Sequence, residues 1–135
     1  MDIKILIGDI ETIKGFSLFG FYNPQEDKWV EFRINKYANQ LYDFVKFCED
    51  YRDYYQVYFN GLKFDSQVIE YVLRNYQNWG ELSNLEVSLK IWKFSQVVID
   101  LTNNEEFPPY SEAQCSIRQI DAFEIPHFSN KARMV

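Results

Sequence analysis

The stretch Ile3-Lys4-Ile5-Leu6-Ile7-Gly8-Asp9-Ile10-Glu11-Thr12 is the one around which the rest of the chain is arranged. It is an apolar run that ends in two carboxylates. The short apolar run predicts a buried strand. Alternate side chains of a strand share a face, so we expect Asp9 and Glu11 to point one way and Ile10 to point into the core. Two adjacent anions repel each other, and a cation or a proton relieves the repulsion. The pair is therefore either half of a site for a hard divalent ion such as Mg²⁺ or a strand end that enters solvent.

Length and composition predict one compact domain over residues 1–135. Hydrophobic residues make up 47% of the 135 residues and aromatic residues 19%, which is enough for a packed core. The formal net charge is −6, so no general basic surface invites nucleic acid. Any polynucleotide would need local contacts or metal ions, which counts against a stand-alone DNA-binding protein.

Cysteine and histidine content argues against several kinds of site. Cys48 and Cys115 have no CxxC spacing, so neither a disulfide framework nor a zinc site is expected, and a reducing compartment fits best. With His127 as the only histidine, a His-based zinc centre or a Ser-His-Asp triad is not expected. The sequence has no run long enough to span a membrane and no secretory leader, so we expect a cytoplasmic protein.

Residue periodicity predicts an α/β fold with a mixed sheet flanked by helices. Three strands, a helix, a strand, a helix and a strand follow in order, which implies an antiparallel meander and then parallel strands. No clear period is found over 80–92. Beyond the first strand, the predicted strands are 16–22, 29–34, 56–59 and 94–99; the predicted helices are 39–51, a second after Asn60-Gly61 that reaches Tyr76, and a short third at 116–123; and 103–110 is a predicted loop.

A second polar segment, Tyr58-Phe59-Asn60-Gly61-Leu62-Lys63-Phe64-Asp65, lies where a parallel strand gives way to a helix. Open α/β sheets bind ligands at this end of their strands. Taken alone, the segment is better explained by local structure, with Asp65 as a helix N-cap and Asn60-Gly61 as a tight turn.

Together, the two segments resemble the first two motifs of the DnaQ-like (DEDD) 3′–5′ exonucleases. Asp9–Thr12 has the form Asp-x-Glu-Thr, and Asn60–Asp65 has the form Asn-Gly-x-x-Phe-Asp. The closest likeness is to the exonuclease domain of the protein-primed family B DNA polymerases of phages, whose second motif Tyr58–Asp65 repeats almost residue for residue. That group also has a Ser/Thr-Leu-x-x-hydrophobic motif, which Ser116–Ile120 matches with Ile in place of Leu. The resemblance covers essentially the whole chain in order.

This resemblance implies a ribonuclease H-like fold with a five-stranded mixed sheet of order 3-2-1-4-5. It implies that Asp9, Glu11 and Asp65 are catalytic carboxylates that hold Mg²⁺ or Mn²⁺, two ions in the family and one in a site with only three carboxylates. Two such ions, about 3.5–4 Å apart, activate an attacking water and stabilise the leaving oxygen. It also implies contacts with the 3′ end of single-stranded DNA from Thr12, Asn60, Phe64, Ser116 and Ile117, although Phe64 is also explained as a core residue under the turn.

One family motif is not found. It has the form Tyr-x-x-x-Asp or His-x-x-x-x-Asp on a late helix and supplies the fourth carboxylate. His127 is followed by Asn130 rather than by an Asp at the required spacing, Asp100 is expected to end the fifth strand, and Asp121 is expected on a solvated helix face. The domain is therefore predicted to be truncated at its C-terminus, before the catalytic helix, with weak or no nuclease activity alone.

The leading hypothesis is a metal-dependent 3′–5′ exonuclease of the proofreading type, in the cytoplasm of a bacterial or phage-infected cell. The remainder of a polymerase or a second copy of the chain would be its protein partner. The alternative is a non-catalytic exonuclease-like module that binds single-stranded nucleic acid or a protein partner, with an acidic surface that mimics DNA. A third, weaker hypothesis is a ribonuclease H-like endonuclease that cuts hybrid duplexes internally.

Overall fold

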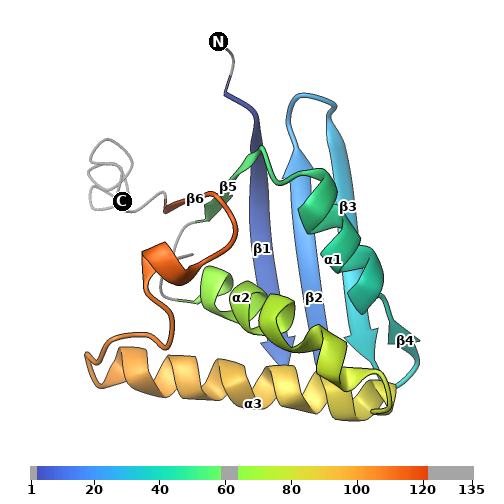
Figure 1. Ribbon diagram of the computed structural model, residues 1–135. Helices are drawn as coiled ribbons and strands as arrows, with labels where there is room; N and C mark the ends of the chain where they lie inside the picture. The colour runs from blue at the N-terminus through green and yellow to red at the C-terminus, as the bar shows by residue number, and fades with distance from the viewer. Residues whose placement is uncertain (1–2, 59–63, 122–135) are drawn as a thin grey trace.

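The structure is a computed structural model that describes residues 3–58 and 64–121. Figure 1 shows α1 and α2 in front of a sheet, with α3 crossing the end of the sheet at which β1 and β3 finish. Within the described ranges, no helix combines the length and the apolar character needed to cross a membrane. The elements are β1 (Ile5–Ile13), β2 (Phe16–Asn23), β3 (Lys28–Asn35), β4 (Ala38–Asn39), α1 (Leu41–Asp50), β5 (Tyr55–Tyr58), α2 (Asp65–Asn75), the 3₁₀ turn η1 (Tyr76–Trp79), α3 (Asn84–Asn103), the 3₁₀ turn η2 (Glu112–Gln114) and β6 (Gln119–Asp121).

The strands form one mixed sheet of six strands in the order β4-β3-β2-β1-β5-β6. The pairs from β1 to β4 are antiparallel, and β5 pairs in parallel with both β1 and β6. The predicted α/β class, with a mixed sheet flanked by helices, is therefore confirmed. The strand order differs from the predicted one, because the two-residue β4 adds a sixth strand at one edge and the last strand is not the segment predicted for it.

The strand predicted at 94–99 is wrong, because these residues lie inside α3. A capping box begins this helix, in which Ser83 accepts from the Glu86 amide and Glu86 accepts from the Ser83 amide, and such a box stops a helix start from fraying. The β-branched run Val97-Val98-Ile99 is typical of a strand. Its buried member, however, is Val98, which lies two helical turns after the buried Ile91 and therefore on the same face of α3. Asp100 consequently lies on a helix rather than at a strand end.

The short helix predicted at 116–123 is also wrong over the residues described. Gln119–Asp121 is strand β6, paired with Gln56–Tyr58 of β5. The reason is that β5 offers unpaired backbone groups along its outer edge, and a segment of three residues gains more from that ladder than from less than one helical turn. Asp121 therefore belongs to a strand and not to a helix face. His127 and Asn130 lie outside the described residues.

One aromatic core joins the helices to the sheet. The ring of Phe44 in α1 lies 4.4 Å from that of Phe19 and 6.0 Å from that of Phe21, both on β2. Phe47, one turn later, lies 4.9 Å from Phe21 and 5.3 Å from Phe32 of β3. Burying each such side chain contributes about 1.5–3 kcal/mol, so this face of the sheet is where the helices are held.

The contact between β1 and β5 is tightest where Gly8 faces Tyr58. A Cβ atom added to Gly8 would lie 2.9 Å from the Tyr58 hydroxyl oxygen and closer still to the ring. Tyr58 is 1% exposed, and its hydroxyl donates to Gln56 Oε1 at 2.5 Å, so the ring has nowhere to move. A side chain at position 8 therefore cannot coexist with the observed packing.

We expect Gly8→Ala to lower the free energy of unfolding by about 2 kcal/mol through overpacking. Urea denaturation followed by circular dichroism measures the change. The matched control is Gly80→Ala, where the nearest atom to a new Cβ, the Tyr42 hydroxyl oxygen, is 4.0 Å away. Equal midpoints for the two variants would contradict the packing described.

Candidate functional site

The two carboxylates of β1 lie on the solvent-facing side of the sheet. Leu6 and Ile10 are 1% and 4% exposed, whereas Asp9 and Glu11 are exposed. This alternation confirms that Asp9 and Glu11 share a face and that Ile10 points into the core. On that face Asp9 pairs with Gly20 and Glu11 with Leu18. The two anions therefore stand in a row on a strand that has β2 on one side and β5 on the other.

Asp65 is the first residue of α2, and its predicted role as N-cap is wrong. The N-cap position is Phe64, which makes no side-chain capping hydrogen bond. Asp65 lies instead in the first turn, where a carboxylate interacts favourably with the positive end of the helix dipole.

A buried phenol connects Asp65 with Asp9. Burial raises the pKa of Tyr58 well above its ordinary value, and the negative charges of Asp65, Cys48 and Asp9 raise it further. Two carboxylates from separate segments thus contribute to the raised pKa of one buried hydroxyl at the end of β5.

A three-carboxylate metal site remains a prediction. Among the residues that the structure describes, no three Asp, Glu, His or Cys side chains are grouped so as to hold a metal ion. In that prediction, Asp9 and Glu11 would supply oxygen ligands from one strand face, which is half of such a site. Asp65 is the third ligand that the sequence predicts.

The residues predicted to contact DNA are in different settings. The Thr12 hydroxyl donates to Ser95 Oγ of α3 at 2.9 Å, and Ser95 donates to the Trp92 carbonyl at 2.7 Å. Thr12 is therefore turned towards α3, on the face opposite to Asp9. Phe64 is half-buried and packs against the hydrophobic core, which agrees with its interpretation as a core residue. Asn60 lies outside the described residues.

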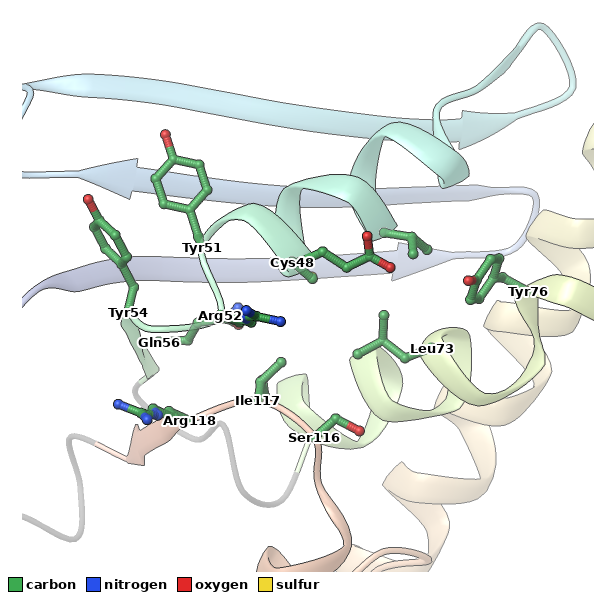
Figure 2. Close-up of a pocket in the computed structure, with 12 residues that line it drawn as sticks. Cys48, Tyr51, Arg52, Tyr54, Gln56, Leu73, Tyr76, Ser116, Ile117 and Arg118 are labelled. Carbon is green, nitrogen blue, oxygen red and sulfur yellow. The ribbon is translucent and has the colours of Figure 1, made fainter.

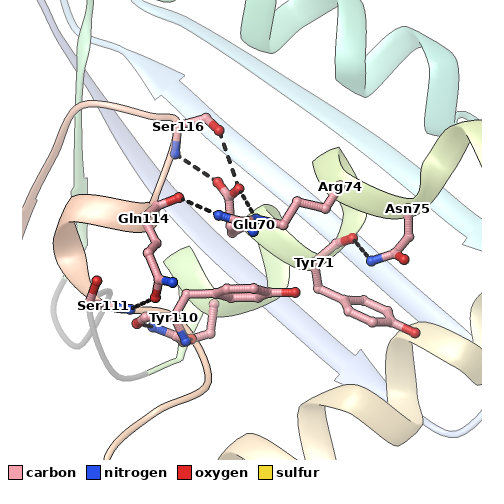
Figure 3. Close-up of polar contacts among 9 residues, drawn as sticks. Glu70, Tyr71, Arg74, Asn75, Tyr110, Ser111, Gln114 and Ser116 are labelled. Atoms are coloured by element: carbon pink, nitrogen blue, oxygen red, sulfur yellow. Dashed lines mark hydrogen bonds and ion pairs between the residues drawn. The ribbon is translucent and has the colours of Figure 1, made fainter.

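Ser116 is held by a buried carboxylate of α2. Glu70 is 2% exposed and accepts from the Ser116 amide at 2.7 Å and from the Ser116 hydroxyl at 3.2 Å. Arg74 donates to Glu70 at 2.6 Å and to the Gln114 carbonyl at 2.9 Å (Figure 3). The segment before β6 is therefore fixed to α2 by charge-assisted hydrogen bonds.

A second clamp acts one turn earlier on α2. The fully buried Gln67 donates to the Tyr110 carbonyl at 2.7 Å and accepts from the Tyr110 amide at 2.9 Å. Sequence reasoning missed both clamps. The only signal was the i,i+4 spacing of Glu70 and Arg74 on the predicted helix, which is more often a surface ion pair.

A cavity of about 280 Å³ lies between α1, α2 and the segment before β6, and Figure 2 shows Ser116 and Ile117 at its edge. Among the described residues, Arg52 and Arg118 form no ion pair with a carboxylate. Because α1 and α2 cover the core face, the structure does not bring Ser116 and Ile117 together with Asp9 and Glu11. The lining residues are Val45, Cys48, Glu49, Tyr51, Arg52, Tyr54, Gln56, Leu73, Tyr76, Ser116, Ile117 and Arg118.

Sequence reasoning also missed an aromatic residue beside Asp9. Trp29 of β3 is 51% exposed, and its indole N–H donates to Glu31 Oε2 at 3.1 Å. A Cβ added to Gly20 would lie 2.5 Å from Cζ2 and Cη2 of this ring. The ring therefore lies over Gly20, which pairs with Asp9. The signal for it was the strand alternation of 29–34, which puts Trp29 and Glu31 on one face.

Comparisons of the chain with protein-family models, with curated proteins and with solved structures found no match. The geometry above therefore carries the functional argument. It offers two places where a ligand could bind: the carboxylate face of β1 and the cavity on the helical side of the sheet.

We expect Glu70→Ala to destabilise the fold by about 2 kcal/mol, because Ser116 and Arg74 lose the buried carboxylate that accepts their hydrogen bonds. The loss should also raise the hydrogen-exchange rates of amides in 110–118, which mass spectrometry can measure. Glu49→Ala, an exposed glutamate on α1, is the control and should change neither quantity. Unchanged exchange at Ser116 in Glu70→Ala would contradict the clamp.

The two cysteines should differ in reactivity. Burial raises the pKa of the Cys48 thiol to about 12, so its thiolate fraction at pH 8 is about a thousandfold below that of an ordinary thiol. Because the folded state keeps this thiol protonated, the fold keeps its full stability below the ordinary pKa of 9.0 and loses stability as the pH rises from 9.0 towards about 12. In Cys115→Ser protein, a thiol reagent such as dithiobis-nitrobenzoate at pH 8 should react only after urea is added. Rapid reaction of the folded protein would contradict the burial.

Proposed function

We propose that this chain is a ribonuclease H-like 3′–5′ exonuclease domain of the proofreading type, dependent on Mg²⁺ or Mn²⁺ and acting on single-stranded DNA ends. The observation that carries the proposal is the exposed pair Asp9 and Glu11 on the open face of a central strand. Two adjacent anions on a solvent-exposed strand face repel each other and add nothing to the stability of the fold. A bound divalent ion would relieve that repulsion.

The topology supports the proposal. When the two-residue β4 is set aside, β1, β2 and β3 form an antiparallel three-strand meander, and the parallel strands β5 and β6 continue the sheet on the other side of β1. The chain leaves β5 and re-enters a helix at Asp65, which is the crossover from a parallel strand where open α/β sheets bind ligands. Asp65 also acts on the same phenol as Asp9.

In this proposal Asp9, Glu11 and Asp65 hold the ions, and their negative charge offsets that of the metal. Bound ions would lower the pKa of an attacking water and stabilise the departing oxygen. The protein supplies the fixed spacing of the carboxylates through β1 and the start of α2. Asn60 is the proposed contact to the terminal nucleotides, and only the half of Phe64 that is not packed against the core is available to join it. The fourth carboxylate would come from the rest of a polymerase or from a second copy of the chain.

The first test is cleavage of 5′-fluorescein-labelled single-stranded DNA with Mn²⁺. We expect slow, stepwise shortening from the 3′ end, reduced to background by Asp9→Asn because one metal ligand loses its charge. Asp53→Asn, in the exposed turn before β5, is the control and should cleave like the unchanged protein. Loss of cleavage on adding a chelator, restored by excess Mn²⁺, would tie the activity to the metal.

Two other outcomes would contradict the proposal. Internal cutting of an RNA–DNA hybrid would favour a ribonuclease H-like endonuclease. Binding without cleavage at any Mn²⁺ concentration would favour the second candidate, a non-catalytic module that binds single-stranded nucleic acid. That candidate is favoured by the absence of a three-ligand group among residues 3–58 and 64–121.

A further inference from the structure

We infer that Trp29 is a stacking platform for an unpaired base of single-stranded DNA whose backbone passes Asp9. The inference rests on the proposed function, because it supplies a base-binding element to the carboxylate face of β1. It comes from the position, the fixation and the exposure of one side chain.

The position of the ring follows from strand register. Trp29 pairs with Tyr22 of β2, and its ring reaches diagonally across β2 to cover Gly20. Gly20 in turn pairs with Asp9, whose carbonyl oxygen lies 3.6 Å from a Cβ built on Gly20. Diagonal neighbours on a sheet face are within reach of a large ring. The indole is therefore beside the carboxylate row.

The ring is fixed in this position by its neighbours. Its N–H donates to Glu31 Oε2, and Arg33 Nη2 donates to the other oxygen of the same carboxylate at 2.6 Å. These hydrogen bonds lower the pKa of Glu31, the one from Trp29 more than the one from Arg33. A ring already held in place loses little rotamer freedom when a ligand stacks on it.

Exposure and charge suit a nucleic-acid strand. Half of Trp29 faces solvent, and every base presents a π-face, so stacking here would be tolerant of sequence. Arg33, in the same cross-strand row as Glu11, has 54% of its side chain exposed. Its guanidinium is paired with Glu31 but has further N–H donors, which a phosphate could accept from on a face that is otherwise acidic.

A purely structural role would also explain part of this geometry, because the ring shields the backbone at Gly20. Trp29→Leu separates the two roles, since leucine keeps an apolar cover but has no π-face. Trp29→Phe keeps a smaller π-face at the same position. Tyr37→Leu is the matched control, because Tyr37 is an aromatic residue that is 87% exposed and lies beyond the end of β3.

The test is titration with an oligo(dT) eight-mer, with phosphorothioate linkages to resist cleavage, in the presence of Mg²⁺, followed by tryptophan fluorescence and by anisotropy of a labelled oligonucleotide. We expect quenching with the unchanged protein. Trp29→Leu should lose the quenching and bind about tenfold more weakly, Trp29→Phe should lose less affinity, and Tyr37→Leu should bind normally. Thermal melting shows whether each variant is folded.

Equal affinity of Trp29→Leu and the unchanged protein would overturn the inference, as would no binding by the unchanged protein. If Trp29→Leu does not fold, acrylamide quenching of tryptophan fluorescence in the unchanged protein replaces this comparison. Added DNA should protect the exposed Trp29 from acrylamide, and a lack of protection would overturn the inference. Cleavage of ordinary DNA is scored separately. Cleavage without a role for Trp29 leaves the proposed function standing, whereas stacking on Trp29 without cleavage supports the inference and the non-catalytic alternative.

Discussion

The rest of the structure depends on the packing of the Tyr58 ring into the space that Gly8 leaves empty. This contact brings β5 against β1 and fixes where the chain leaves the sheet before α2. It also buries a phenol whose pKa is raised by burial and then by the charges of Asp65 and Asp9. A larger residue at position 8 would displace the Tyr58 ring or the strand that carries it, so one glycine controls how β1 and β5 pack against each other.

The strands and helices that sequence analysis predicted well are those with a strong local pattern. Strand alternation in β1 correctly predicts the faces of Ile10 and Asp9, and helical spacing correctly predicts α1. The wrong predictions fall in segments whose secondary structure is determined by contacts with residues distant in the sequence. The β-branched run Val97–Ile99 is typical of a strand. The capping box at Ser83 and the packing of the buried face of α3 against the core override that preference. Gln119–Asp121 is a strand only because β5 offers it an edge.

The candidate site was predictable in part for the same reason. Asp9 and Glu11 share a face by strand geometry alone, whereas the surroundings of Asp65 depend on how β5 and α2 meet. Ser116 and Ile117 match a motif in sequence, yet Glu70 holds them on the helical side of the sheet. The sequence did not single out Trp29, because the position of its ring depends on Gly20 on the neighbouring strand. A linear motif identifies residue types, but strand pairing must be known before residues can be placed on one side of the sheet.

The clamp between Glu70 and Ser116 has a consequence for the edge of the sheet. β6 is three residues long and pairs with a strand far back in the chain, so loop-closure entropy opposes its docking. The clamp offsets part of that cost, because it fixes the segment before β6 to α2. Without β6 the outer edge of β5 would be bare, and a bare parallel edge is a template for pairing with another chain. A buried carboxylate on α2 therefore helps to keep that edge closed to other chains.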